Sequence, residues 1–191
     1  MWRKQVFPNT CILLYVLFTI TDSYTTYLST PDLKYEANPV YLYFKWGWAV
    51  HLIYISFLVA LTILFATFSN RYVIRYFKGK KRNTRKANPW LIVCFLLLTY
   101  CYFNLVVTFE CSINNYLNYR YLYINEKSFI RQIAVNYVEF YSKFDNSYGE
   151  FSFMYLVTAI EILIAALITF FRFKSVKKYL LSSTCNRRVI L

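Results

Sequence analysis

Only a few side chains in this chain could do acid–base or metal chemistry, since its 191 residues include one histidine and nine acids. A carboxylate beside a histidine supports either metal ligation or proton transfer. No HExxH, GxSxG or Ser/His/Asp spacing diagnostic of a known catalytic site is present. We therefore favour a protein that is not an enzyme and that holds no cofactor or metal. The candidate polar residues are Asp22, Thr25, Thr26, Glu36, Asn38, His51, Asn104 and Glu110, with Glu161 standing apart from them.

The elements that position these residues are four long apolar stretches. A helix that crosses the roughly 30 Å hydrocarbon core needs about 20 mostly apolar residues. Four buried helices of a soluble protein are excluded, because so few polar residues would remain to cover them. The sequence therefore predicts an all-α integral membrane protein with a single four-span domain over residues 1–191. The predicted spans cover residues 7–28, 46–68, 89–113 and 151–171.

The charged residues between the spans predict the orientation. Basic residues without acids fill two segments, the one between the second and third spans and the tail at 172–191. The other two connecting segments mix acids and bases. Because Lys and Arg accumulate in cytoplasmic loops, both termini are expected on the cytoplasmic side. The first basic segment carries Arg71, Arg75, Lys78, Lys80, Lys81, Arg82, Arg85 and Lys86.

The formal net charge of +13 also raises the question of nucleic-acid binding. A basic segment next to a span is already explained by contact with anionic lipid, where each Lys or Arg contributes about 1 kcal/mol. We therefore expect anionic lipid headgroups as partners of the basic loop, and no nucleic acid.

The segment at 114–150 is predicted to be an outer loop that contains an amphipathic helix. Its apolar residues recur at three- and four-residue steps, and its Tyr and Phe residues suit the headgroup region. The helix either lies on the membrane as a lid or forms a docking surface for another subunit, and we favour the lid. The apolar positions are Phe129, Ile130, Ile133, Tyr137, Phe140, Tyr141 and Phe144.

Helical rise places most of the candidate residues at one depth, in the outer third of the membrane. Asp22 lies about 15 residues into the first span, and His51 and Asn104 reach a similar level. Thr25 and Thr26 share a helix face with Asp22. The cluster either lines a cavity that binds a metal, protons or a polar headgroup, or fixes helix packing through bonds of about 1 kcal/mol each. We favour packing.

Glu161 is predicted to lie near the middle of the fourth span. A carboxylate at that depth must be protonated or must meet a partner, because an isolated charge in hydrocarbon is costly. The predicted spans supply no Lys or Arg at that depth. Glu161 therefore indicates either proton handling or contact with another subunit.

The first predicted hairpin carries the pattern D-x-x-T-T…E-x-N-P. The matching residues are Asp22, Thr25, Thr26, Glu36, Asn38 and Pro39. This pattern resembles that of a family of small prokaryotic membrane proteins of unknown function, in which it joins the first two spans. The resemblance covers about the first third of the chain. It implies a multi-span protein of a prokaryotic inner membrane and implies no particular activity.

Our leading hypothesis is an accessory or structural subunit of a membrane complex, with other subunits or further copies of this chain as partners. The rival hypothesis is an enzyme or carrier that uses the polar cluster on a lipid-linked or ionic substrate. A bacterial or archaeal cytoplasmic membrane is the expected location. The aromatic, glycine-poor composition also permits a mitochondrial inner membrane.

Overall fold

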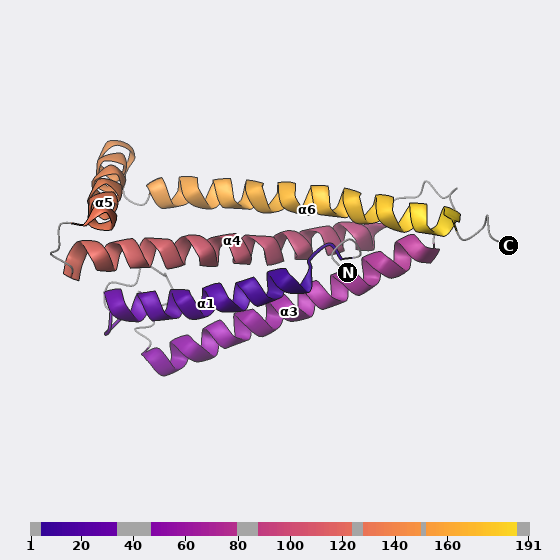
Figure 1. Ribbon diagram of the computed structural model, residues 1–191, viewed down its shortest axis with the longest axis horizontal. Coiled ribbons are helices and arrows are strands. Elements are labelled where there is room, and N and C mark those ends of the chain that lie inside the picture. The colour runs from indigo at the N-terminus through magenta and orange to yellow at the C-terminus, as the bar shows by residue number, and fades with distance from the viewer. Residues whose placement is uncertain (1–4, 34–46, 80–87, 124–127, 150–151, 187–191) are drawn as a thin grey trace.

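The computed structural model describes residues 5–33, 47–79, 88–123, 128–149 and 152–186 (Figure 1). This part of the chain forms five α-helices and contains no strand, which confirms the all-helical prediction. The helices are α1 (Asn9–Ser29), α3 (Trp48–Gly79), α4 (Pro89–Tyr123), α5 (Phe129–Tyr148) and α6 (Ser152–Asn186).

Four of these helices, α1, α3, α4 and α6, are long and apolar enough to cross a membrane by length and composition. Their number and order agree with the four predicted spans. The start of α4 also follows the expected Asn-Pro pattern, since Pro89 is its first residue and the Asn88 side chain accepts a hydrogen bond from the Trp90 amide at 3.0 Å.

Three of the helices extend well past the predicted ends of their spans. α3 continues through Arg71, Arg75 and Lys78, α4 continues to Tyr123, and α6 continues to Asn186. The apolar run marks only the part suited to hydrocarbon, whereas a nucleated helix propagates through any good helix former, including Arg, Lys and Leu. Residues that we assigned to the basic loop, the outer loop and the tail therefore belong partly to helices.

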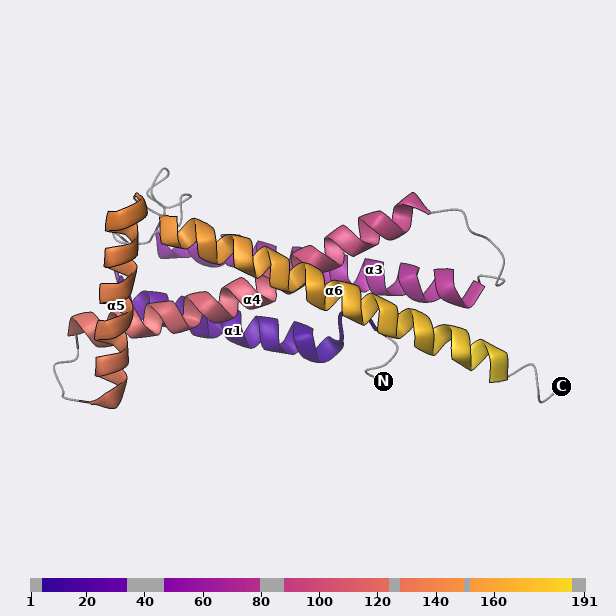
Figure 2. The same ribbon diagram turned by 90° about the horizontal axis from the view of Figure 1, so that it is seen from above.

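α4 is the central helix of the molecule, because it packs against α1, α3, α5 and α6. α1, α3 and α6 run lengthwise beside it, whereas α5 lies across one end of the long helices (Figures 1 and 2). Direct contact between α1 and α3 is sparse. The three helices around α4 are thus held together mainly through α4.

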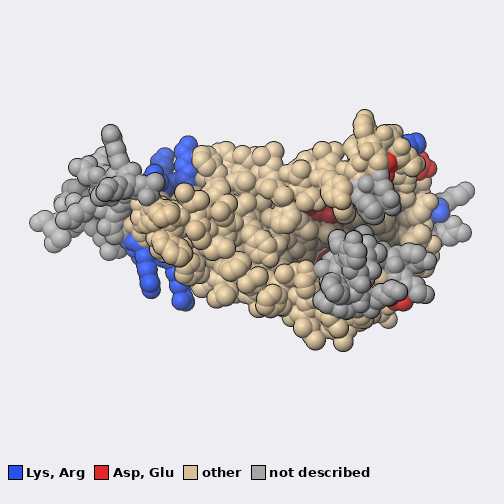
Figure 3. All heavy atoms as spheres, turned by 180° about the vertical axis from the view of Figure 1, so that it is seen from behind, with Lys and Arg blue, Asp and Glu red and all other residues tan. Residues whose placement is uncertain are grey.

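The two ends of the molecule differ in charge. Lys and Arg gather at one end in Figure 3, and acidic side chains appear toward the other. We call the first the basic end, which includes Arg71, Arg75, Lys78, Arg172, Lys174, Lys177 and Lys178, and we call the second the α5 end. The separation agrees with the charge asymmetry found in the sequence.

The apolar core lies mainly toward the basic end. Its buried members come from the segment before α1 and from α3, α4 and α6. The rings of Phe77 and Phe173 meet edge to face at 5.8 Å between α3 and α6. The core consists of Val6, Phe7, Ala66, Val73, Phe77, Cys94, Leu98, Cys101, Tyr102, Ala165, Val176 and Leu180.

α5 is the predicted amphipathic helix, and its position depends on a cap and on aromatic packing. The Ser128 hydroxyl caps its first turn by accepting from the Arg131 amide at 3.2 Å. Gly149 ends it with φ at 105°, a conformation that favours glycine. The Phe153 ring at the start of α6 then packs against four α5 rings, those of Tyr137, Phe140, Tyr141 and Phe144.

Candidate functional site

The α5 end brings Asp22 and Thr26 of α1 against α4. One amide links them, since Asn115 Nδ2 donates to Asp22 Oδ1 at 3.0 Å and to Thr26 Oγ1 at 2.8 Å. Ser112, one turn earlier on α4, donates to the Phe18 carbonyl of α1 at 3.1 Å. Asp22 and Thr26 therefore both bond to α4 through Asn115.

The sequence did not predict Asn115 as a site residue. Its position fell in the presumed outer loop, because the third span was expected to end at residue 113. A longer helix would have placed Asn115 on α4 at the depth of Asp22. The signal was present in the run at 111–116, which carries no Pro or Gly to stop the helix.

Two further acids lie on α4 and α6. Glu110 of α4 and Glu161 of α6 lie within electrostatic range of each other. The Cys111 thiol of α4 lies within electrostatic range of Asp22, Glu110 and Glu161. We call these four residues the carboxyl cluster. Figure 3 shows acidic atoms recessed within the apolar surface toward the α5 end.

Glu161 is the most buried member of the carboxyl cluster, with only 6% of its surface exposed. Its Oε1 atom has no hydrogen-bond partner among the residues that the structure describes. Glu110 and Asp22 are partly exposed. Burial of an unpaired carboxylate oxygen is costly, so this atom marks the least satisfied position in the cluster.

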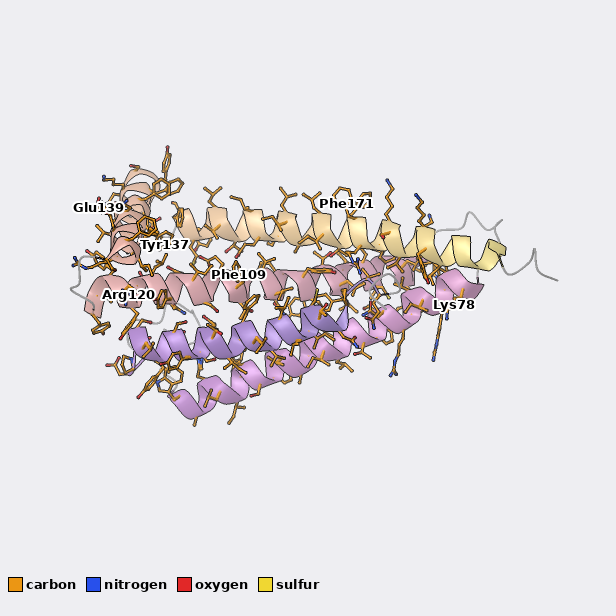
Figure 4. The ribbon with its side chains drawn as sticks, viewed as in Figure 1. Lys78, Phe109, Arg120, Tyr137, Glu139 and Phe171 are labelled. Carbon is orange, nitrogen blue, oxygen red and sulfur yellow. The ribbon has the colours of Figure 1, made fainter. Side chains whose placement is uncertain are left out.

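Tyr137 of α5 lies within electrostatic range of Glu110 and Cys111. This side chain lies at the junction of α5 with the long helices (Figure 4). Burial, followed by the nearby charges of Glu110, Tyr141 and Cys111, raises the pKa of Tyr137 to about 12. The neutral phenol is therefore the form that fits this position.

His51 lies at the start of α3, where it is buried under Trp48. The two rings meet edge to face at 4.9 Å. Trp48 also contacts Tyr27 of α1 and donates to the Pro31 carbonyl through Nε1 at 2.7 Å. His51 thus belongs to the aromatic contact that joins the end of α1 to the start of α3.

Asn104 lies apart from the Asp22–Asn115 link. Its amide donates to the Thr62 hydroxyl of α3 at 2.9 Å, and the Cys101 thiol contacts the Thr62 carbonyl at 3.5 Å. Thr25 donates to the carbonyls of Thr21 and Asp22 within its own helix. The structure therefore brings Asp22 and Thr26 together, and Cys111 lies within electrostatic range of both Asp22 and Glu110. Asn104 and Thr25 make their hydrogen bonds away from this group.

Several predicted residues fall outside the described part of the chain. Glu36 and Asn38 of the first hairpin are among them. Arg71, Arg75 and Lys78 lie on the last turns of α3. The remaining basic residues, Lys80, Lys81, Arg82, Arg85 and Lys86, lie outside the described residues.

A polar contact that the sequence did not predict lies at the basic end. Asn70 Oδ1 accepts hydrogen bonds from the amides of Val6 and Phe7, both at 3.0 Å, and Asn70 Nδ2 donates to the Phe7 carbonyl at 2.7 Å. The Tyr102 hydroxyl donates to the Val6 carbonyl at 2.6 Å, and Arg172 donates to the Gln5 carbonyl at 2.8 Å. We call this the Asn70 clasp, since it fastens residues 5–7 to α3, α4 and α6.

An open groove of about 460 Å³ separates α1 from α3. It is mostly apolar, with the hydroxyls of Thr19, Ser23 and Ser56 along it. Thr19 and Ser23 direct their hydroxyls to backbone carbonyls of their own helix. The groove is consistent with the sparse contact between these two helices.

Among the described residues, no group of three or more His, Cys, Asp or Glu side chains is arranged to hold a metal ion. No protein-family model matches the chain, no curated protein matches it significantly, and neither does any solved structure.

Proposed function

We propose that this protein is a non-catalytic subunit of a membrane assembly, a four-span protein with both termini in the cytoplasm. The observation that carries the proposal is the use made of its polar residues. Asp22 and Thr26 bond to Asn115, and Asn104 bonds to Thr62, so these side chains link helices. Interhelical bonds of this kind contribute about 1 kcal/mol each to association in lipid.

The charge distribution supports the orientation. Basic residues gather on α3 and α6 at one end, which the positive-inside rule assigns to the cytoplasm. Anionic headgroups on that side are the partners of the basic end. The resemblance of the first hairpin favours the cytoplasmic membrane of a bacterium or archaeon over the mitochondrial inner membrane.

The position of α5 supports a lid at the outer face. It lies across the long helices, as a helix in the headgroup plane would (Figure 2). Its exposed apolar side chains include Phe129, Ile133 and Phe140. A lid at the outer face would bring them against the outer leaflet. Proposed partner subunits then contact the apolar flanks of the long helices.

The experiment is purification of the tagged full-length protein in a gentle detergent, followed by mass spectrometry of the protein and lipid that accompany it. We expect protein partners, or further copies of this chain, in a fixed ratio. Asp22→Asn keeps the shape of the side chain and much of its hydrogen bonding, so the assembly should persist with this variant. The proposal would be contradicted if the protein purified as a single copy without partners and if Asp22→Asn abolished its cellular activity while the protein level stayed unchanged.

The rival function, a carrier or an enzyme acting on an ionic or lipid-linked substrate, is favoured by one observation. Glu161 is buried and its Oε1 atom has no hydrogen-bond partner among the described residues. Bound substrate in the same purification, together with loss of substrate in a Glu161→Gln variant, would favour this alternative.

A further inference from the structure

We propose that Arg120 and Arg131 form a binding site for one phosphate group, at the junction of α4 with the first turn of α5. The phosphate belongs either to a phospholipid headgroup or to free phosphate in solution, since both present the same oxygen atoms. The site goes beyond the proposed subunit role, and it rests on the proposed lid only for the choice between these two sources.

The Ser128 hydroxyl places the Arg120 guanidinium at the start of α5. Its oxygen accepts a hydrogen bond from Arg120 Nη2 at 3.2 Å and another from the backbone amide of Arg131, also at 3.2 Å. Ser128 is the N-cap residue of α5. The Arg120 side chain, which Figure 4 shows at the α5 end, therefore reaches from α4 to the first turn of the next helix.

Arg131 lies on the face of α5 that packs against the long helices. Ala134, three residues later on the same face, has none of its surface exposed, and α5 packs against α4. Gln132 and Ile133, between the two, are exposed. Both arginine residues thus belong to the junction of α4 with α5.

Each of the two guanidinium groups has a buried donor that is not hydrogen bonded. The Nε atoms of Arg120 and Arg131 are buried, and neither has a hydrogen-bond partner among the residues that the structure describes. A buried donor on a charged group is costly to leave unpaired, so such donors in native proteins generally bind an acceptor. An acceptor that serves both side chains needs several oxygen atoms.

The charge at this junction selects an anion. The first turn of α5 contains no acidic residue. The helix dipole adds partial positive charge at the same place, so the start of α5 and the two arginine residues together attract negative charge. Helix N-termini bind phosphate through their free amides, and the planar guanidinium group matches two phosphate oxygens at once. A phosphate group therefore suits both the charge and the donors.

The depth of the junction favours a lipid phosphate. Arg120 lies about 46 Å along α4 from Pro89 at the usual helical rise. The hydrocarbon core is roughly 30 Å thick, and the headgroups extend the bilayer to about 40–45 Å. The exposed side chains nearby include Tyr121, Tyr123 and Phe129, which are typical of the headgroup region. A helix that enters the membrane at Pro89 thus brings Arg120 to the opposite layer of headgroups.

The experiment measures amide hydrogen exchange at residues 129–131 by mass spectrometry, with the full-length protein in lipid nanodiscs. Three preparations are compared, namely phosphatidylglycerol, a neutral glycolipid without phosphate, and the same glycolipid with added inorganic phosphate. We expect exchange on the order of tenfold slower in phosphatidylglycerol than in glycolipid alone, because charge-assisted hydrogen bonds would hold the first turn. Slower exchange with inorganic phosphate as well would identify free phosphate as a second source.

Two variants test whether the slower exchange depends on the arginine pair. Arg131→Gln removes one of the two charges and keeps the bond between Arg120 and Ser128, so the three preparations should then exchange at similar rates. Lys143→Gln removes a positive charge from an exposed position of the same helix and should keep the difference. Equal effects of the two variants would overturn the proposal, since general surface charge would then explain the result.

Equal exchange in all three preparations of the native protein would also overturn the proposal. The chain itself would then satisfy the arginine pair, and Glu126, which lies outside the described residues, is the nearest acid in the sequence. This comparison needs no variant to fold. It is also independent of whether partner subunits copurify, so the proposed subunit role is tested separately.

Discussion

The basic end and the α5 end of this molecule are held together by different interactions. At the basic end, buried apolar side chains from three helices meet, and the Asn70 clasp satisfies the polar backbone of residues 5–7. At the α5 end, α1 and α3 are separated by a groove, and single polar links such as Asn115 to Asp22 connect the helices. The carboxyl cluster lies in this looser half.

The difference shows which end provides stability and which can accommodate a costly group. In lipid, apolar surface gains little by leaving its surroundings, so close packing and hydrogen bonds drive helix association. The basic end has both close apolar packing and hydrogen bonds between its segments. The α5 end instead keeps a buried acid, Glu161, which is not part of the apolar core.

The largest effect is expected from Asn70→Ala at the basic end. The change leaves the amides of Val6 and Phe7 and the carbonyl of Phe7 without their side-chain partner in a buried place. We expect a loss of about 3 kcal/mol in the free energy of unfolding, measured by denaturation in mixed micelles. Asn136→Ala, at an exposed position of α5, is the control and should change little. Equal effects of the two variants would show that the clasp contributes no stability.

The second-largest loss of stability is expected when a packed side chain at the basic end is shortened. Leu98 is fully buried, whereas Ile20 is 61% exposed on α1. Leu98→Ala creates a cavity and should cost about 2 kcal/mol. Ile20→Ala removes a side chain that faces outward and should cost less than about 0.5 kcal/mol. The same micelle assay measures both, and a larger loss for Ile20→Ala would mean that the groove side is covered by a partner.

The polar link at the α5 end should contribute less. Asn115→Leu keeps the approximate side-chain size but removes both donated bonds to α1, and we expect a loss of about 1 kcal/mol. Asn118→Leu is the matched control, since the Asn118 amide bonds to Asn114 within α4. A cysteine pair placed across α1 and α4 would report the separation of the helices through its rate of crosslinking. Identical rates in both variants would contradict a role for Asn115.

The smallest effect concerns the pH dependence of α5. Burial, with Glu110 nearby, raises the Tyr137 pKa from 10.0 to about 12, so the folded state retains this proton where the unfolded state loses it. Its contribution to stability is complete below pH 10 and is lost as the pH rises through about 12. Tyr137→Phe should therefore remove a tyrosinate absorbance change near pH 12. Tyr148→Phe, at a position 73% exposed on the same helix, is the control. If the absorbance change lost in the two variants had the same size and the same midpoint, the raised pKa would not belong to Tyr137.

The sequence predicted the helices better than it predicted their contacts. Apolar runs identified all four candidate spans, and the three- and four-residue steps identified α5. Depth alone grouped Asn104 with Asp22, but helices also have faces, and Asn104 turns toward Thr62 of α3. Packing between distant segments decides which face of a helix meets which neighbour. The pattern of a single sequence does not reveal this packing.

The Asn70 clasp was also beyond prediction for a physical reason. An Asn next to a basic segment is typical of a helix end, and nothing local shows that its amide will bind backbone 63 and 64 positions away. Glu161 was the opposite case. Its cost in hydrocarbon follows from residue type and position alone, so it could be singled out before any contact was known.

The clasp has a consequence for the order of assembly during synthesis. Residues 5–7 leave the ribosome before any of the helices, yet their backbone is bound by Asn70 of α3, Tyr102 of α4 and Arg172 of α6. The contact between Arg172 and Gln5 spans 167 positions. Asn70 and Tyr102 are available once α3 and α4 have been made, whereas the Gln5 carbonyl meets Arg172 only after α6 has been made. Formation of α6 thus completes the contacts to residues 5–7, and a nascent chain that stops before α6 lacks the bond from Arg172 to Gln5.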